Sequence, residues 1–181
     1  MKEEIIIAGF GGQGVLSMGK ILAYGGIMQD QEVSWLPSYG PEMRGGTCNV
    51  SVVLSDNKIS SPILSKFDTA IILNQQSMDK FENQVKPGGL LIYDTNGITR
   101  HPERKDIQIC RIDAVEEAAK LGNAKAYNMV VLGAYLKMKP VVTMDNVIKG
   151  LKKSLPPRRH NLIPMNEQAI TVGMNAVVKV R

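Results

Sequence analysis

Apolar residues gather along the chain in two kinds of segment, which together predict a regular alternation of strands and helices. Short, continuous apolar runs that are rich in β-branched residues and end at a glycine or a turn predict buried strands. They lie at residues 4–10 (EIIIAGF), 33–36, 69–74 (TAIILN), 90–95 (LLIYDT) and 107–112 (IQICRI). Longer segments with apolar residues three or four positions apart predict helices. They lie at residues 14–28, 75–85, 113–122, 126–138, 147–155 and 164–180.

Residues 47–60 predict an antiparallel hairpin, because TCNVSVVLS alternates in part, SDN makes a turn and KIS resumes an extended course. Strands that alternate with helices elsewhere indicate an α/β fold. We expect a Rossmann-like open, mostly parallel sheet with helices on both faces and this antiparallel hairpin inserted after the second strand. The length of 181 residues fits a single domain, residues 1–181.

Turn-forming residues mark the ends of several predicted helices. The KPGG segment at 86–89 ends the helix of residues 75–85. Asp113 is the expected N-cap of the next helix and Gly122 its stop, and Thr143 or Asp145 caps the helix at 147–155. The apolar face of the first helix comprises Val15, Leu16, Met18, Ile21, Leu22 and Ile27.

Composition limits the class of protein. A hydrophobic fraction of 44% and a charged fraction of 22% suit a globular core. No apolar run approaches the roughly 20 residues that span a bilayer, and the charged MKEE start is unlike a signal peptide. We therefore expect a cytoplasmic protein without a membrane partner. Cys48 and Cys110 are too few and too far apart in sequence to hold an iron–sulfur cluster or a structural zinc by themselves.

The net charge of +5 arises largely from a basic cluster around a Pro-Pro break. The cluster comprises Lys149, Lys152, Lys153, Arg158 and Arg159. It lacks the interleaved aromatic residues of single-strand binders and a recognisable reading helix, so a solvated or subunit-facing basic edge is favoured over nucleic acid binding.

The segment GFGGQG at residues 9–14 is the first candidate for chemistry. It matches G-x-G-x-x-G through Gly9, Gly11 and Gly14, between a predicted strand and a predicted helix. Such glycines allow a tight turn and close backbone approach to a ligand, and the helix N-terminus offers free N–H groups to an anion. This is the structural half of a dinucleotide fingerprint.

The half of the fingerprint that recognises a nucleotide is absent. A NAD site needs an acidic residue at the end of the second strand, but that strand ends Ser-Trp-Leu-Pro at 34–37. An arginine for a phosphorylated ribose is not found there either. A P-loop needs Gly-Lys-Ser or Gly-Lys-Thr where this chain has Gln-Gly-Val at 13–15. Bound NAD, FAD or a nucleoside triphosphate is therefore the minority interpretation.

A second glycine-rich loop, PSYGPEMRGGTCN at 37–49, has more polar side chains than the GFGGQG turn. Prolines and glycines fix its backbone around Tyr39, Glu42 and Arg44. In an open α/β sheet this loop leaves the carboxyl end of the second strand, so we expect it beside the GFGGQG turn, forming one surface with it.

Three segments together resemble a known family: GFGGQG near the start, SYGPEMRGG at 38–46 and AYNMVVLGA at 126–134. They are similar to the gamma subunit of 2-oxoacid:ferredoxin oxidoreductases, which include the pyruvate, 2-oxoisovalerate and 2-oxoglutarate enzymes. The resemblance covers nearly the whole chain, and SYGPEMRGG is its most specific part.

The resemblance implies one part of an enzyme complex. Members of the family use thiamine diphosphate to decarboxylate a 2-oxoacid, pass electrons through iron–sulfur clusters to ferredoxin and transfer the acyl group to coenzyme A. The thiamine diphosphate, its magnesium and the clusters are carried mainly by alpha, beta and delta-type chains. We accordingly expect no cofactor held by this chain alone, alpha, beta and delta-type partners, and self-association of the isolated chain.

The expected cofactor-binding or subunit-interface residues come from both loops, and no catalytic or metal-binding residue is assigned. They are Gly9, Gly11, Gly12, Gln13, Gly14, Tyr39, Gly40, Pro41, Glu42, Arg44, Gly45 and Gly46. Gln13 can donate to a phosphate, to the pyrophosphate of coenzyme A or to a neighbouring carbonyl. Arg44 can bind a carboxylate or phosphate with paired hydrogen bonds, or pair with Glu42.

Other polar residues have simpler interpretations. Asn128 is expected on a buried helical face with a backbone partner. Asp94 either lines the cleft at the sheet edge or caps the following turn. Cys48 is expected to be a small buried residue, and neither His101 nor His160 has a metal-ligand partner at suitable spacing.

Overall fold

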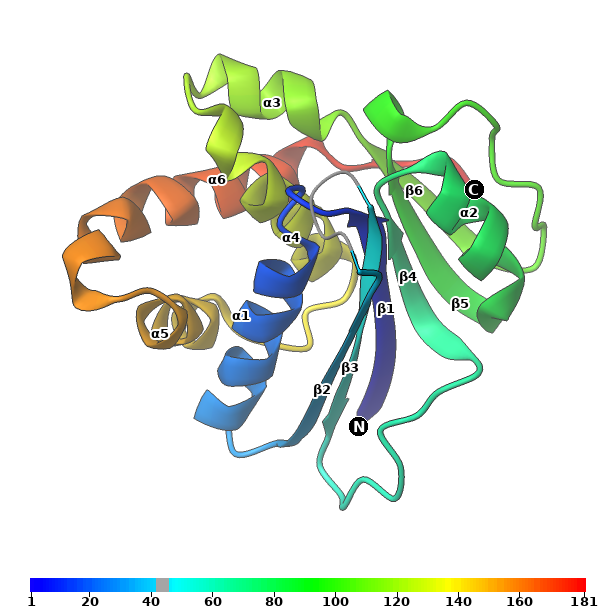
Figure 1. Ribbon diagram of the computed structural model, residues 1–181, viewed down its shortest axis with the longest axis horizontal. Helices are drawn as coiled ribbons and strands as arrows, with labels where there is room; N and C mark the ends of the chain where they lie inside the picture. The colour runs from blue at the N-terminus through cyan, green and yellow to red at the C-terminus, as the bar shows by residue number, and fades with distance from the viewer. Residues whose placement is uncertain (42–45) are drawn as a thin grey trace.

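The computed structural model describes residues 1–41 and 46–181, and Figure 1 shows the arrangement. The strands are β1 (Lys2–Phe10), β2 (Glu32–Tyr39), β3 (Thr47–Ser55), β4 (Phe67–Ile72), β5 (Val85–Asp94), β6 (Gln108–Ile112) and β7 (Val178–Lys179). The helices are α1 (Val15–Met28), α2 (Gln75–Phe81), α3 (Ala114–Lys120), α4 (Tyr127–Met138), α5 (Met144–Ser154) and α6 (Ile163–Ala176). Short 3₁₀ turns lie at Glu82–Gln84, Thr95–Gly97, Ala124–Ala126 and Pro157–Leu162.

The described strands form one open sheet in the order β2-β3-β1-β4-β5-β6-β7. Strands β1, β4, β5 and β6 pair in parallel. Strand β3 is antiparallel to both β1 and β2, and β7 is antiparallel to β6. Because β2 is reversed twice relative to β1, the two strands run in the same direction. The predicted fold class, an open and mostly parallel α/β sheet with an antiparallel hairpin, is confirmed.

Helices cover both faces of the sheet, as expected, but unequally. Figure 1 shows α1, α3, α4, α5 and α6 on one side and α2 on the other. The side chains of β1 explain its continuous apolar run, because Ile5 and Ile7 enter the core under the larger helical layer while Ile6 and Ala8 enter the core under α2. A parallel strand covered on both faces needs apolar residues at every position.

Helices α4 and α6 cross with their backbones in close approach. A Cβ atom added to Gly133 would lie 1.9 Å from the Ile170 carbonyl oxygen, and one added to Gly173 would lie 1.9 Å from the Val130 carbonyl oxygen. The two glycines therefore face one another's helices and set the distance between them. This pair fixes α4, whose first turn faces the glycine turn after β1.

The hairpin comprises an earlier segment of the sequence than predicted. Residues 47–55 form the single strand β3, and its partner is β2, which pairs from Glu32 opposite Ser55 to Tyr39 opposite Cys48. The expected second arm at 58–60 lies outside any strand. Strand β2 continues past 36 because it is an edge strand, where Pro37 can be accommodated without losing a ladder hydrogen bond to a second neighbour.

Two predicted helix ends and one predicted buried position were also wrong. The helix at 75–85 ends at Phe81, and KPGG lies inside β5, where Gly88 takes φ 76 and the pairing with β4 shifts register. The last helix ends at Ala176, and the chain then pairs as β7 with β6. In α1, Ile27 is 50% exposed rather than part of the buried face.

The expected caps are only partly found. Thr143 caps α5, with its Oγ1 accepting a hydrogen bond from the Asn146 N–H at 3.3 Å, which decides between the two candidates. Asp113 precedes α3 but makes no capping bond; its carboxylate accepts a hydrogen bond from the Thr95 hydroxyl instead. Gly122 follows α3 with φ 71, the left-handed conformation typical of a helix stop.

Candidate functional site

The glycine turn connects β1 to α1 and requires glycine for two separate reasons. Gly12 and Gly14 have φ 95 and φ 77, in the left-handed region that residues with a side chain rarely adopt. Gly9 is limited by space, because an added Cβ would lie 2.5 Å from the Gln13 Oε1 atom and 2.9 Å from the Leu73 Cβ atom. The turn is therefore built for close backbone packing.

Gln13 uses its side chain to hold the turn together. Its Oε1 atom accepts a hydrogen bond from the Phe10 N–H at 2.6 Å, and its Nε2 atom donates to the Leu73 carbonyl at 3.3 Å. Among the partners proposed from the sequence, the structure shows the neighbouring carbonyl. The amide links the end of β1 to the residue that follows β4, the next strand in the sheet.

The two glycine-rich loops meet at the same edge of the sheet. The Gly11 N–H donates to the Gly46 carbonyl at 2.7 Å, which extends the β1–β3 ladder beyond Phe10 and Thr47. The expectation that the loops form one surface is confirmed for the described residues. We call this surface the glycine rim, meaning Gly9–Gly14, Tyr39–Pro41 and Gly46.

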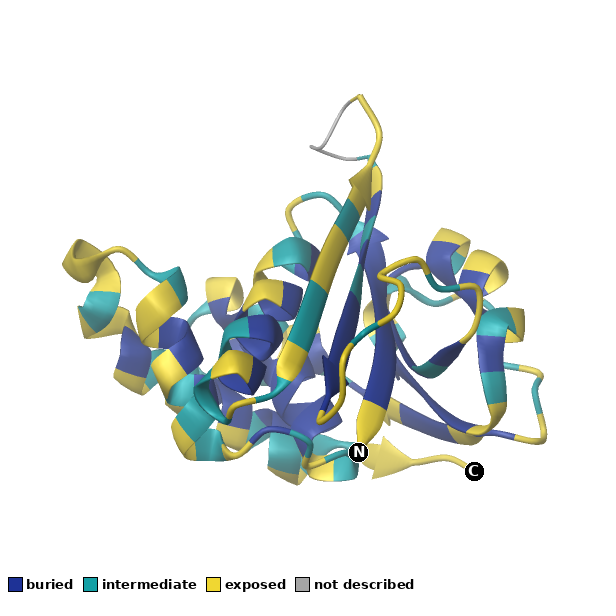
Figure 2. Cartoon of the chain, turned by 90° about the horizontal axis from the view of Figure 1, so that it is seen from below, coloured by how far each residue is buried: buried dark blue, intermediate teal, exposed yellow. Residues whose placement is uncertain are grey.

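The exposed part of the glycine rim lies at the end of β2. Tyr39 is 56% exposed, and Gly40 and Pro41 are exposed beside it. Figure 2 shows β2 and its end among the most exposed parts of the sheet. Glu42, Arg44 and Gly45, which were also predicted to belong to the site, lie outside the described residues.

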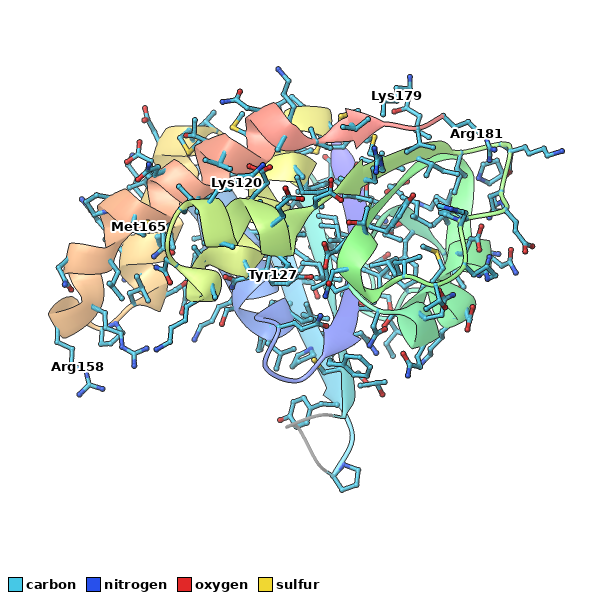
Figure 3. All side chains as sticks on the ribbon, turned by 90° about the horizontal axis from the view of Figure 1, so that it is seen from above. Lys120, Tyr127, Arg158, Met165, Lys179 and Arg181 are labelled. Atoms are coloured by element: carbon cyan, nitrogen blue, oxygen red, sulfur yellow. The ribbon has the colours of Figure 1, made fainter. Side chains whose placement is uncertain are left out.

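A shallow hollow of about 170 Å³ lies beside the glycine turn, between the start of α1 and the start of α4. Its walls include Gly12, Gly14, Lys125 and Tyr127, and Figure 3 labels Tyr127. Asn128 closes one side and donates to the Gly14 carbonyl at 3.4 Å. It therefore has the expected backbone partner, although it is half-buried rather than buried.

A larger hollow of about 390 Å³ adjoins the first, since both have Lys125 and Asn128 in their walls. Its floor is apolar and includes Ile21, Met129 and Leu151, and Arg159 stands on its wall. No acidic side chain is among the described residues that line either hollow. An uncharged floor with basic walls suits an anionic ligand or an acidic partner surface.

Asp94 is buried at the carboxyl end of β5 and serves as a structural acceptor. It is 1% exposed, and its carboxylate accepts hydrogen bonds from the Tyr127 hydroxyl at 2.8 Å and the Ala114 N–H at 3.2 Å. Burial raises the pKa of Asp94 above its usual range and also raises that of Tyr127. Asp94 is buried rather than lining a cleft, and its side chain caps the start of α3 instead of the turn Thr95–Gly97 that follows it directly.

Tyr127 was missed by the sequence reasoning. It stands in the AYNMVVLGA segment, where helical spacing marks apolar positions and gives no signal for a hydroxyl that reaches the end of β5. The polar pair Asp94 and Tyr127 joins the sheet edge to α4, so the hollow beside the glycine turn has a fixed wall. The contact between Asp94 and Tyr127 can be recognised only from the folded structure, because the two residues are far apart in the sequence.

The sheet order argues against a dinucleotide site at the glycine turn. In dinucleotide-binding folds the parallel strand that holds the ribose lies directly beside the first strand. Here that place is occupied by the antiparallel strand β3, and β2 lies one strand further out, roughly 10 Å from β1 at the usual strand spacing. The residues that end β2, Pro37 to Tyr39, also carry no acid.

The remaining candidates have structural surroundings. Cys48 is buried at 4% exposure, as expected, and Cys110 is fully buried; burial raises the pKa of both thiols. The His160 ring lies 3.0 Å from the Lys152 carbonyl and 2.9 Å from the Leu155 carbonyl. Among residues 1–41 and 46–181, no cluster of three or more His, Cys, Asp or Glu side chains is arranged to hold a metal ion. None of the helices in these ranges has the length and apolar character needed to cross a membrane.

These features define the chain as a Rossmann-like α/β domain in which a hairpin and a glycine turn share one exposed edge. Residues 4–176 match the family described as pyruvate ferredoxin/flavodoxin oxidoreductase. The chain belongs to this family, and the resemblance inferred from its motifs is confirmed.

Two relatives and a solved structure agree with this family assignment. The chain is 36% identical to ketoisovalerate oxidoreductase subunit VorA of Methanothermobacter thermautotrophicus over 94% of its own length but 35% of that protein. It is 33% identical to 2-oxoglutarate synthase subunit KorC of Methanocaldococcus jannaschii, over 86% of the chain and 85% of the relative. A keto/oxoacid ferredoxin oxidoreductase gamma subunit from Geobacter sulfurreducens has the same fold, with a TM-score of 0.82, 27% identity and coverage of 97% and 96%.

Proposed function

We propose that this chain acts as the gamma subunit of a thiamine diphosphate-dependent 2-oxoacid:ferredoxin oxidoreductase. The complex would convert a 2-oxoacid to an acyl-CoA and pass the electrons to ferredoxin. Family membership supports the proposal, as does similarity over most of its length to a subunit of 2-oxoglutarate synthase. The chain spans about a third of the VorA relative, which is consistent with a module that works beside other polypeptides.

The glycine rim is the surface that we assign to the docking of partner chains. The observation that carries this assignment is the 2.7 Å hydrogen bond from the Gly11 N–H to the Gly46 carbonyl, which joins two glycine-rich loops into one edge. Tyr39 adds an exposed aromatic side chain to this edge. Exposed aromatic residues on a rigid backbone are typical anchors of protein interfaces.

The proposal assigns thiamine diphosphate, magnesium and the iron–sulfur clusters to alpha, beta and delta-type partners. The two cysteines of this chain support that division. Both lie in the apolar core with raised thiol pKa values, and a cluster ligand must be a thiolate that reaches the metal. What this chain would contribute is the shape and placement of the partners' active site.

Co-expression with candidate alpha, beta and delta-type chains tests the docking surface. We expect the chain to co-purify with them, and Tyr39→Ala to weaken the complex at least tenfold while leaving the chain folded. Ile63→Ala is the matched control, because Ile63 is 78% exposed and lies in the connection between β3 and β4, at the end of these strands opposite to the glycine rim. Equal complex formation by both variants would contradict the assignment of the rim.

A free-standing nucleotide-dependent oxidoreductase is the alternative function. Thermal unfolding of the isolated chain with NAD, NADP, FAD or coenzyme A distinguishes the two, since a ligand at 100 times its dissociation constant stabilises a protein by about 2.7 kcal/mol. We expect no shift with any of the three dinucleotides. Turnover of a metabolite by the chain alone with a nicotinamide or flavin would refute the subunit proposal.

The two adjoining hollows favour a role of the same edge in the approach of coenzyme A. Lys125 and the N-terminus of α1 offer a cation and free N–H groups to a phosphate, and Arg159 lies further along the apolar floor. In the assembled enzyme we expect Lys125→Gln to raise KM for coenzyme A without changing KM for the 2-oxoacid. An unchanged KM for coenzyme A would remove this role.

Two surface properties complete the proposal. Trp35 and Leu36 on the edge strand β2 are 38% and 41% exposed, so we expect the isolated chain to self-associate, measured by sedimentation velocity. The basic cluster on α5 and the following turn is exposed, as a solvated or subunit-facing edge would be. Binding to random duplex DNA at low salt would instead favour the nucleic acid interpretation.

A further inference from the structure

A separate cavity of about 310 Å³ opens on the face of the sheet that α2 covers. Its floor is formed by Tyr93 of β5 and Arg111 of β6, which are direct partners in the register of the two strands. Ile98 and His101 line one wall from the segment after β5, and Val180 lines the other from the C-terminal segment. The site lies near the carboxyl ends of parallel strands, where open α/β sheets bind ligands.

Three polar side chains that line this cavity, those of Arg111, Tyr93 and His101, have no acidic partner among the described residues. Arg111 makes no ion pair or side-chain hydrogen bond among residues 1–41 and 46–181, whereas Arg100 is bound to Glu82 and Arg104 to Asp106. The Tyr93 side chain is 3% exposed overall, and its hydroxyl makes no hydrogen bond within the same described residues. His101 also lines the cavity.

The neighbouring acceptors are already engaged. The Thr95 hydroxyl donates to the Asp113 carboxylate, which therefore has a partner other than Arg111. The Thr99 hydroxyl donates to the Gln75 side chain at 3.2 Å. None of the described residues that line the cavity is acidic. The unpaired groups are thus a guanidinium, a phenol and an imidazole, which together complement an oxyanion.

The non-polar part of the cavity limits what the oxyanion is attached to. Ile98 and Val180 line the cavity together with Tyr93, whose ring is also apolar. A ligand with a carboxylate or phosphate on a short apolar body would bury that body against these side chains while its oxygens face Arg111. A dinucleotide is too large for a cavity of about 310 Å³.

We propose that this cavity is a binding site for a small organic anion, a carboxylate or a phosphate ester with a short apolar body, held by Arg111 and Tyr93. The site is distinct from the glycine rim and does not depend on the proposed function. It lies on the opposite face of the sheet from the two hollows beside α4.

The test is titration of the full chain labelled with ¹⁵N, followed by amide chemical shifts. The probes are isobutyrate as a carboxylate, methyl phosphate as a phosphate ester, and isobutyramide as an uncharged analogue of the first. We expect saturable shifts centred on residues 93–101 and 111 with one or both anions and none with isobutyramide. Which of the two anions binds more tightly identifies the head group.

Variants separate a built site from general attraction to a basic protein. Arg111→Gln should weaken binding at least tenfold, because it removes the charged donor. Tyr93→Phe should weaken it about 2- to 10-fold through loss of one hydrogen bond. Arg158→Gln is the matched control, because Arg158 is also an exposed arginine but lies far from the cavity. Figure 3 shows it at the opposite end of the molecule from Lys179 and Arg181, the neighbours of the lining residue Val180.

Three results would overturn the proposal. One is the absence of saturable shifts with both anions in natural protein. Another is equal binding of isobutyrate and isobutyramide, which would show an apolar cavity without anion recognition. The third is equal weakening by Arg111→Gln and Arg158→Gln, which would show unspecific attraction. Unchanged shifts elsewhere in each variant's spectrum would establish that the variants remain folded.

Discussion

Substitution of the two left-handed glycines by alanine separates backbone strain from crowding at the glycine turn. Gly12 and Gly14 have similar φ values, 95 and 77. A Cβ added at Gly12 would meet no described residue within 4 Å, whereas one added at Gly14 would lie 2.4 Å from the Asn128 Nδ2 atom and 2.8 Å from its Cβ atom. Gly12→Ala therefore tests strain alone, and Gly14→Ala tests strain together with a collision against α4.

The structure sets the magnitudes. A left-handed conformation costs a residue with a side chain about 1–2 kcal/mol, which is the expected cost of Gly12→Ala. Overpacking adds about 1–3 kcal/mol, so Gly14→Ala should cost about 2–5 kcal/mol in total. Asn128→Ala removes the colliding amide, and in that background the cost of Gly14→Ala should fall by about 1–2 kcal/mol. Part of the excess should remain, because the alanine retains the Cβ atom at 2.8 Å.

Urea unfolding followed by circular dichroism gives the four free energies of the Gly14 and Asn128 double-mutant cycle, with Gly12→Ala as the reference for strain. At this chain length each kcal/mol corresponds to about 2–4 °C in Tm. If Gly14→Ala lowers the free energy of unfolding no more than Gly12→Ala does, the inferred collision with Asn128 of α4 is wrong. An excess cost that is identical with and without the Asn128 side chain would show that another contact limits Gly14.

Three further substitutions test the contacts that hold the rim and the helical layer. Gln13→Leu removes the hydrogen bonds to Phe10 N–H and the Leu73 carbonyl, and should cost about 1–3 kcal/mol in urea unfolding, with faster amide exchange at Phe10. Gly173→Ala places a Cβ 1.9 Å from a backbone oxygen of α4 and should cost at least about 3 kcal/mol; a loss below 1 kcal/mol would contradict the close crossing. Burial raises the pKa of Asp94 above 3.8, so its carboxyl group binds a proton more tightly in the folded state than in the unfolded state. The natural protein therefore loses stability as the pH rises from 3.8 through the pKa of the folded state. Relative to natural protein, Asp94→Asn should therefore gain stability as pH rises there, and a parallel pH dependence of the two proteins would contradict the raised pKa.

The parts of the fold that the sequence predicted are those decided by local patterns. Continuous apolar runs located β1, β4 and the second half of β5 because both faces of these strands are covered there. The glycine turn was predicted from its spacing, and Gly12 and Gly14 take the positive φ values that such a turn needs. Glycine followed by the helix pattern was enough to place α1.

The parts that the sequence did not predict depend on pairing across the sheet. The second half of β2 contains Pro37 and polar residues, so its sequence lacks the apolar run or alternation that predicts a strand. Only its pairing with β3 keeps this segment extended to Tyr39. Val178–Lys179 is two residues long and became a strand because it lies against β6. The bond between Tyr127 and Asp94 joins residues 33 positions apart, and helical periodicity contains no information about it.

The position of β3 explains why the dinucleotide fingerprint is incomplete. A G-x-G-x-x-G turn is selected by the geometry of a strand that passes into a helix, and that geometry is the same whatever lies beside the strand. Ribose recognition depends on the next strand, and here β3 arrives antiparallel, so its first residue rather than its last stands beside the turn. Gly46 precedes that residue and accepts the Gly11 N–H, a backbone donor that a pyrophosphate would otherwise compete for. The same hairpin thus removes the ribose acceptor and ties up a phosphate donor, and in exchange it places the exposed Tyr39 beside the turn. A glycine fingerprint followed by a hairpin rather than a second parallel strand therefore argues against a nucleotide pocket, and it is compatible with the docking surface proposed above.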